Sequence, residues 1–97
     1  MDSSDDMYVV PNPGGTISYV EAGEGPAIVW LHGIGSGARS WHHQKTFFSD
    51  CFRVVMWNAP GYGQSTPPRN HFPSAGDYAV SLVGLLDTLQ IRRCHLV

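Results

Sequence analysis

The chain has 97 residues, of which 42% are apolar and 14% are charged, and its formal net charge is -2. This length allows one small domain with a single core, because domains commonly hold about 100 to 150 residues. Lys and Arg together number only 6, so neither a nucleic acid nor an anionic membrane surface is expected as a partner.

No targeting segment is expected at the N-terminus. Residues 1–6 are an acidic leader that we expect to be disordered, and residues 7–97 are expected to form one continuous unit. A secretory signal would need a basic start and an apolar stretch of about 7 to 15 residues, and a membrane-spanning helix would need about 20. Neither is present in the sequence, which therefore predicts a cytoplasmic protein that does not enter a membrane.

The sequence contains no recognisable metal motif. Cys51 and Cys94 lack a C-x-x-C spacing, and we expect both to be buried thiols outside any disulfide. His42 and His43 are adjacent, so on a helix they point about 100 degrees apart and have no partner four residues away. No metal site is expected.

The predicted elements begin with an N-terminal hairpin. Residues 7–10 and 16–21 alternate in part between apolar and polar side chains, and a Pro-Asn-Pro-Gly-Gly turn separates them. Residues 27–31 and 54–57 are apolar at every position, which is typical of parallel strands covered on both faces. Between them, residues 33–50 place Trp41, Lys45 and Phe48 at helical spacing and predict a crossover helix.

The clearest helical pattern follows Pro73. Ser74 and Asp77 fit a capping box, which predicts that the helix begins there. Five apolar side chains then recur on one face: Tyr78, Leu82, Leu85, Leu86 and Leu89. Residues 94–97 predict a last strand, so the alternation of strands and helices indicates an α/β fold with a parallel sheet. Because no helix or cap follows this strand, we expect the chain to be the N-terminal part of a larger domain. A 97-residue protein with an exposed last strand is the other interpretation.

A glycine-rich turn follows the strand at residues 27–31. Its sequence is His-Gly-Ile-Gly-Ser-Gly at residues 32–37, and its glycines allow backbone N–H groups to approach a ligand closely. This pattern favours binding of a negatively charged oxygen, although a tight structural connection is also consistent with it. Gly33, Gly35 and Ala38 also match a dinucleotide G-x-G-x-x-A pattern. However, Asn58 stands where the ribose-binding acid is expected, so a dinucleotide-binding half-domain is less favoured and no cofactor is expected.

A second loop, Asn-Ala-Pro-Gly-Tyr-Gly-Gln-Ser at residues 58–65, follows the strand at 54–57. The order of His-Gly-x-Gly, Pro-Gly-x-Gly-x-Ser, an amphipathic helix and Cys-His-Leu-Val resembles the N-terminal third of the α/β-hydrolase fold family. The resemblance covers about residues 7–97. Within that family the chain is most similar to the esterases, enol-lactonases and carbon–carbon bond hydrolases. It implies an α/β-hydrolase sheet truncated before the nucleophile elbow, with a small molecule as substrate.

The resemblance also implies roles for the glycine-rich turn. One donor of the oxyanion hole in this fold comes from the loop after the third strand, and the matching group is the backbone N–H of Ile34. Gly33, Gly35, Ser36 and Trp41 would then lie at the substrate pocket. Trp41 is equally expected as an ordinary core aromatic.

Other matching residues are expected to shape the loops rather than to react. His32 would hold the turn through hydrogen bonds, because the triad histidine of the family comes near the end of the domain. Asn58, Pro60, Gly61 and Gly63 would shape the second loop. Asn58 and Pro60 stand where the family often has Asp and Arg, which removes one ion pair.

The resemblance places the reacting groups elsewhere. No serine of the sequence lies in Gly-x-Ser-x-Gly, and in the family the strand matching residues 94–97 leads into that elbow, with the acid and the histidine later. We therefore expect a hydrolase of ester, lactone or activated carbon–carbon bonds whose Ser-His-Asp triad lies beyond this chain, and an inactive 97-residue chain. An Asp nucleophile would instead indicate epoxide or carbon–halogen chemistry. A non-catalytic binding protein with the same fold is the other hypothesis, and the oligomeric state is unknown.

Overall fold

The computed structural model describes residues 7–97, so the leader predicted for residues 1–6 lies outside the described residues. β1 (Tyr8–Asn12) and β2 (Gly15–Ala22) form the predicted antiparallel hairpin. β3 (Ala27–Trp30) pairs parallel with β4 (Arg53–Trp57) and with β5 (Cys94–Leu96). β2 pairs antiparallel with β4, which gives the strand order β1-β2-β4-β3-β5. The predicted α/β class, with its parallel strands, is confirmed.

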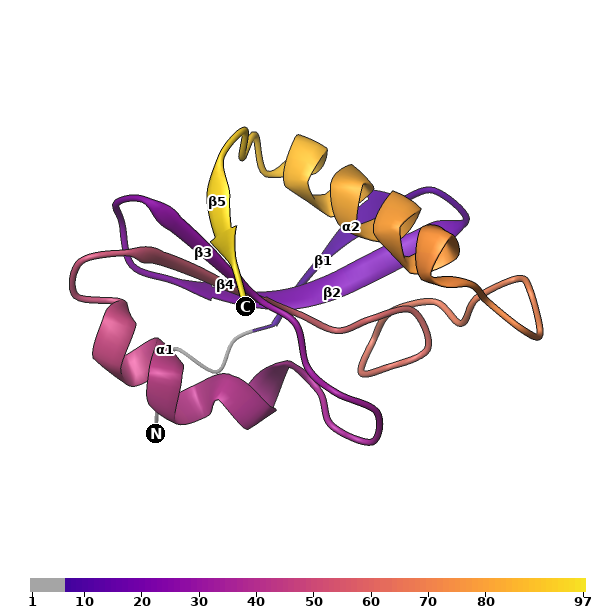
Figure 1. The fold of residues 1–97 in the computed structure, drawn as a ribbon, viewed down its shortest axis with the longest axis horizontal. Helices are drawn as coiled ribbons and strands as arrows, with labels where there is room; N and C mark the ends of the chain where they lie inside the picture. Colours follow the sequence, from indigo (N-terminus) through magenta and orange to yellow (C-terminus); the bar gives the residue numbers. More distant parts are fainter. Residues whose placement is uncertain (1–6) are drawn as a thin grey trace.

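The helices cover opposite faces of this sheet (Figure 1). A 3₁₀ helix, η2 (Ala38–Trp41), continues into α1 (His42–Phe48) between β3 and β4. α2 (Ala75–Thr88) connects β4 to β5. Both connections return the chain to the same edge of the sheet, as parallel pairing requires. The predicted crossover helix is therefore confirmed.

The two-sided cover explains why the central strands are apolar at every position. In β3, Val29 packs with Leu85 of α2 in one core cluster. Ile28 and Trp30 point to the other face and pack in a second cluster, against which Phe48 of α1 lies. Successive strand residues alternate between faces, so a strand covered on both sides needs no polar positions.

The capping box of α2 is formed as predicted. The Ser74 hydroxyl accepts a hydrogen bond from the Asp77 N–H at 3.2 Å, and the Asp77 carboxylate accepts one from the Ser74 N–H at 2.8 Å. Leu85, on the predicted apolar face, is fully buried, whereas Val80 and Val83 are exposed. Neither α-helix within residues 7–97 is long and apolar enough to cross a membrane.

The prediction that both cysteines are buried is wrong for Cys51, which is exposed, and Cys94 is only partly buried. Cys51 lies in the turn between α1 and β4, where its backbone packs closely against Gly25 and the side chain is left in solvent. Cys94 begins β5, which has a neighbour on one side only in the described sheet. Neither cysteine is in a disulfide.

Candidate functional site

The turn after β3 and the loop after β4 lie at the same edge of the sheet (Figure 1). β3 and β4 are parallel neighbours, with Trp30 beside Met56 in the register. Parallel strands end at a common edge, so the segments that follow them, residues 31–37 and 58–66, are brought together by the sheet. These two segments contain all but one of the residues that the sequence singles out for a site.

Residues 33–36 form a four-residue turn that is closed by the Ser36 N–H donating to the Gly33 carbonyl at 3.1 Å. Gly35, its third residue, has a φ of 81°, which glycine adopts without steric cost. The Ile34 side chain is 98% exposed. Within residues 7–97 the Ile34 N–H has no hydrogen-bond acceptor. Apart from the adjacent residues, no atom would lie within 4 Å of a Cβ at Gly33 or Gly35. The turn therefore presents an unpaired donor between two glycines that face open space.

His32 connects the turn to the second loop. Its Nε2 accepts a hydrogen bond from the Ala59 N–H at 3.1 Å, so this nitrogen carries no proton. The proton of the neutral ring is then on Nδ1, which lies 2.9 Å from the Gly33 carbonyl and donates to it. The edge of the imidazole also packs against the ring of Tyr62, with centroids 4.6 Å apart. Both ring nitrogens are thus used by backbone groups and not by a serine or a carboxylate.

Asn58 is a buried junction between the two segments and β2. Its Oδ1 accepts a hydrogen bond from the Ala38 N–H at 2.9 Å, at the start of η2. Its Nδ2 donates to the Ser18 hydroxyl at 2.9 Å. Asn58 is only 3% exposed, so these bonds satisfy polar groups that water does not reach. An amide suits this position because it accepts on one side and donates on the other, which an ionised carboxylate cannot do.

Two further serines complete this junction: Ser65, which ends the 58–65 loop, and Ser18 of β2, neither of which is predicted from the sequence as a site residue. The Ser65 hydroxyl donates to the Asn58 carbonyl at 2.6 Å and accepts from the Ser18 N–H at 2.9 Å. The Ser18 hydroxyl accepts from the Gln64 N–H at 3.1 Å. Ser18 and Ser65 are both buried. A signal for Ser18 exists in the sequence, since a small polar residue stands between Ile17 and Tyr19 in a strand.

The glycines of the second loop allow this close packing. Gly63 has a φ of 53°, and a Cβ there would lie 2.5 Å from Nδ2 of Asn58. Gly61 has a φ of 89° and donates its N–H to the Thr66 carbonyl at 3.1 Å, which closes the loop. Pro60 is half-buried beside it. Asn58, Pro60, Gly61 and Gly63 therefore lie together in one compact loop.

Trp41 and Ser36 occupy different surroundings. Trp41 packs against Trp30, with ring centroids 5.0 Å apart, beside the core cluster on the α1 face. Its Nε1 is buried and has no hydrogen-bond partner within the described residues. Ser36 is exposed at the end of the glycine turn. Of the residues predicted for the pocket, Gly33, Gly35 and Ser36 share the turn, whereas Trp41 packs as a core aromatic.

The groups at this edge of the sheet can act on a ligand through hydrogen bonding and charge. It offers a backbone donor from an open turn, held by His32 and Asn58 from behind. In the part of the chain that the structure describes, no group of three or more His, Cys, Asp or Glu side chains could hold a metal ion. An arrangement of this kind can bind an oxygen that carries negative charge.

Comparison with known proteins decides the family. The family model described as "Alpha/beta hydrolase family" matches residues 28–97, which include both loops of the site. The chain belongs to the alpha/beta hydrolase family. In this member of the family, the 33–36 turn lies in the loop between β3 and η2.

Two relatives of this family member are named as hydrolases. The chain is 36% identical over 85 residues to a 2-hydroxy-6-oxo-6-phenylhexa-2,4-dienoate hydrolase of Comamonas testosteroni. This alignment covers 84% of the chain and 30% of the relative. It is 43% identical over 51 residues to an (E)-2-((N-methylformamido)methylene)succinate hydrolase of Acinetobacter baylyi. This alignment covers 53% of the chain and 19% of the relative. The structure of an epoxide hydrolase from Vigna radiata matches with a TM-score of 0.87 and 28% identity, over 94% of this chain and 30% of that one. The chain thus spans less than a third of the length of these proteins.

Proposed function

We propose that the protein carrying this chain is a hydrolase of ester, lactone or activated carbon–carbon bonds, and that the Ile34 N–H is one donor of its oxyanion hole. One observation carries the proposal: this N–H has no acceptor within residues 7–97 and belongs to an exposed turn whose glycines leave the space beside it open. An unpaired donor held in place before reaction stabilises a developing oxyanion without reorganisation. The hydrolase names of the relatives support the same reaction class.

In the proposed reaction a serine hydroxyl attacks the carbonyl carbon of the substrate. A histidine takes the hydroxyl proton, and the carbonyl electron pair moves onto the oxygen, which the Ile34 N–H binds. The histidine then returns the proton to the leaving group as its bond to the carbonyl carbon breaks and the carbonyl re-forms on the serine. Water, deprotonated by the same histidine, attacks this acyl-serine, and the proton returns to the serine oxygen as the acid is released. Gly33, Gly35 and Ser36 would line the acyl side of the pocket. Trp41 packs against Trp30 in the core, with the two rings tilted by 47°, and is not assigned to the pocket.

We further propose that the Ser-His-Asp triad lies beyond Val97. His32 has both ring nitrogens bonded to backbone groups, and no serine of the chain stands in a Gly-x-Ser-x-Gly sequence. The test is to read the coding sequence past the codon for Val97. We expect Gly-x-Ser-x-Gly directly after it. An Asp in place of the serine would replace this reaction by epoxide or carbon–halogen chemistry, which the similarity to an epoxide hydrolase makes the second candidate. A stop codon would contradict the proposal and favour a binding protein.

The 97-residue chain alone is expected to be inactive. An oxyanion donor contributes about 3 to 4 kcal/mol, and only after a nucleophile has formed the oxyanion. The purified chain should therefore hydrolyse a p-nitrophenyl ester no faster than buffer, whereas the full-length protein at the same concentration should do so. Saturable turnover by the chain alone would show that it contains its own catalytic groups, which contradicts a triad beyond Val97.

A further inference from the structure

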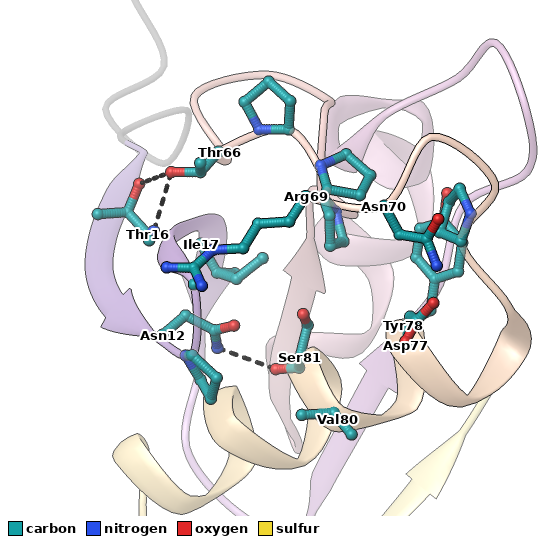
Figure 2. A pocket seen from close by; sticks show the side chains of 17 residues that line it. Asn12, Thr16, Ile17, Thr66, Arg69, Asn70, Asp77, Tyr78, Val80 and Ser81 are labelled. Carbon is teal, nitrogen blue, oxygen red and sulfur yellow. Dashed lines mark hydrogen bonds between the residues drawn. The ribbon is translucent and has the colours of Figure 1, made fainter.

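A hollow lies away from the glycine turn, between the β1–β2 hairpin, the loop before α2 and the first turns of α2 (Figure 2). Its volume is about 220 Å³. Three segments that are far apart in the sequence form its walls, and none of them contains Ile34. The hollow shares Pro60 with the second loop of the candidate site but includes no residue of the glycine turn.

Hydrogen bonds between the walls hold this cavity open. The Thr16 N–H donates to the Thr66 hydroxyl at 3.0 Å, and the two threonine hydroxyls lie 3.1 Å apart. The Thr66 N–H donates in turn to the Thr16 carbonyl at 3.0 Å. On the other side, the Asn12 amide donates to the Ser81 carbonyl at 2.9 Å and joins the hairpin to α2 (Figure 2). Ligand sites are usually formed in advance in this way.

The lining of the cavity is mainly rigid and apolar. Ile17, which is 1% exposed, and the half-buried ring of Tyr78 are part of it. Five prolines also contribute their rings: Pro13, Pro60, Pro67, Pro68 and Pro73. Proline has no backbone N–H and little side-chain freedom to lose. These walls therefore favour a flat apolar group over a hydrated polar one.

Arg69 supplies the positive charge. Its side chain reaches from the proline-rich loop across the cavity, with the guanidinium toward Thr16 and Asn12 (Figure 2). Among residues 7–97 no carboxylate forms a salt bridge with it, in contrast to Arg53, which pairs with Glu21. A guanidinium that has no partner is a strong site for a carboxylate, which it binds with two parallel hydrogen bonds.

The other polar groups of the lining leave donors in excess. Asp77 is the acidic residue of the lining, and its carboxylate is used by the Ser74 N–H of the capping box. In Figure 2 it lies beside Tyr78, on the side away from the guanidinium. The Asn70 Oδ1 accepts from the Phe72 N–H at 3.1 Å, which leaves its amide N–H groups as donors.

We propose that this cavity binds a small monocarboxylate with a flat apolar body, with Arg69 holding the carboxylate and the proline rings and Tyr78 enclosing the body. The volume is below the about 300 Å³ at which ligand pockets commonly begin, so the body is no larger than one ring.

Titration of the isotope-labelled full-length protein with sodium benzoate, followed by NMR, tests this site. We expect shifts of the amides of Thr16, Asn70 and Ser81. Arg69→Gln should weaken benzoate binding by about tenfold or more, because a hydrogen bond to a charged group is lost. Arg69 is exposed, so this variant should fold normally. Arg92→Gln, which removes an exposed arginine outside this lining, is the matched control and should bind as the wild type does.

Benzyl alcohol, a neutral molecule of the same shape, separates the charge from the apolar walls. It should bind more weakly than benzoate to the wild type and equally to wild type and Arg69→Gln. Equal benzoate affinity in wild type and Arg69→Gln would overturn the proposal. Shifts confined to the amides of residues 33–36 would also overturn it, because benzoate would then occupy the proposed oxyanion site instead.

Discussion

The turn at residues 33–36 and the loop at residues 58–65 follow neighbouring parallel strands but are built in opposite ways. The turn is exposed, is closed by one backbone hydrogen bond, and makes one further bond, from the Gly35 N–H to the Tyr62 hydroxyl at 3.4 Å. Apart from the adjacent residues, no atom would lie within 4 Å of a Cβ at Gly33 or Gly35. The loop folds over Asn58, which is buried and bonded to groups from three segments of the chain. One segment presents a donor to solvent, and the other uses the Asn58 amide and the Ser65 hydroxyl in buried hydrogen bonds.

The difference shows how a backbone N–H is kept available for a reaction. An exposed turn of four residues would by itself sample several conformations, because few contacts hold it. Here its two ends are fixed from the second loop. The Ala59 N–H bonds His32 before the turn, and Asn58 accepts the Ala38 N–H after it. The loop therefore supplies the rigidity and the turn supplies the open position.

The largest expected effect is that of Gly63→Ala. Alanine at this position would have to adopt the left-handed backbone conformation of Gly63. Its Cβ would also lie 2.5 Å from Nδ2 of the buried Asn58 amide. We expect the free energy of unfolding to fall by about 3 kcal/mol, as measured by urea unfolding of the full-length protein.

Gly33→Ala is the matched control for this substitution. Its Cβ would enter open space, and Gly33 does not have a left-handed φ. The free energy of unfolding, measured in the same way, should change by no more than about 0.5 kcal/mol. Equal costs at the two glycines would mean that turn and loop are packed alike, which contradicts the difference described above.

Asn58→Ala is expected to have the next largest effect. It removes the acceptor of the Ala38 N–H and a partner of the Ser18 hydroxyl, both at buried positions. A cost of about 2 kcal/mol follows from leaving such groups unpaired. Asn70→Ala, at an exposed amide, should cost much less in the same unfolding experiment. If the two variants were equally stable, Asn58 would not be the junction inferred from its bonds.

Gly35→Ala should have a smaller effect, because only the backbone conformation opposes it. Its φ is 81°, but no atom lies near the new Cβ. We expect a loss of about 1 kcal/mol in the unfolding free energy. Gly35→Asn should restore part of it, since Asn tolerates the left-handed region better than Ala. A loss as large as that of Gly63→Ala would show hidden packing at the turn.

The sequence predicts the fold well because the fold rests on periodic patterns. The apolar runs that became β3 and β4, and the Ser74–Asp77 capping box of α2, depend on local spacing, and all of them are confirmed. The exposure of Cys51 was not predictable in this way. It depends on a turn in which the backbone packs against Gly25 and the side chain does not.

The candidate site is harder to predict from the sequence than the fold, because the hydrogen bonds that hold it join residues far apart in the chain. Asn58 was expected to shape its own loop, but its partners Ala38 and Ser18 are 20 and 40 residues away. Likewise, Ser65 is 47 residues from Ser18. No spacing rule connects such residues before the sheet brings the strands together. The oxyanion role of the Ile34 N–H stays a prediction that the geometry allows.

The most direct test of that role is to remove this one N–H and keep the turn. Ile34→Pro does so, because proline has no N–H and is favoured at the second position of a turn whose third residue has a positive φ. Ile34→Ala is the control, since the native side chain is 98% exposed. In the full-length protein acting on a p-nitrophenyl ester, we predict that kcat falls by about 10² to 10³ for Ile34→Pro and stays near wild type for Ile34→Ala. An Ile34→Pro variant that folds and retains the wild-type kcat would contradict the proposed role of the turn.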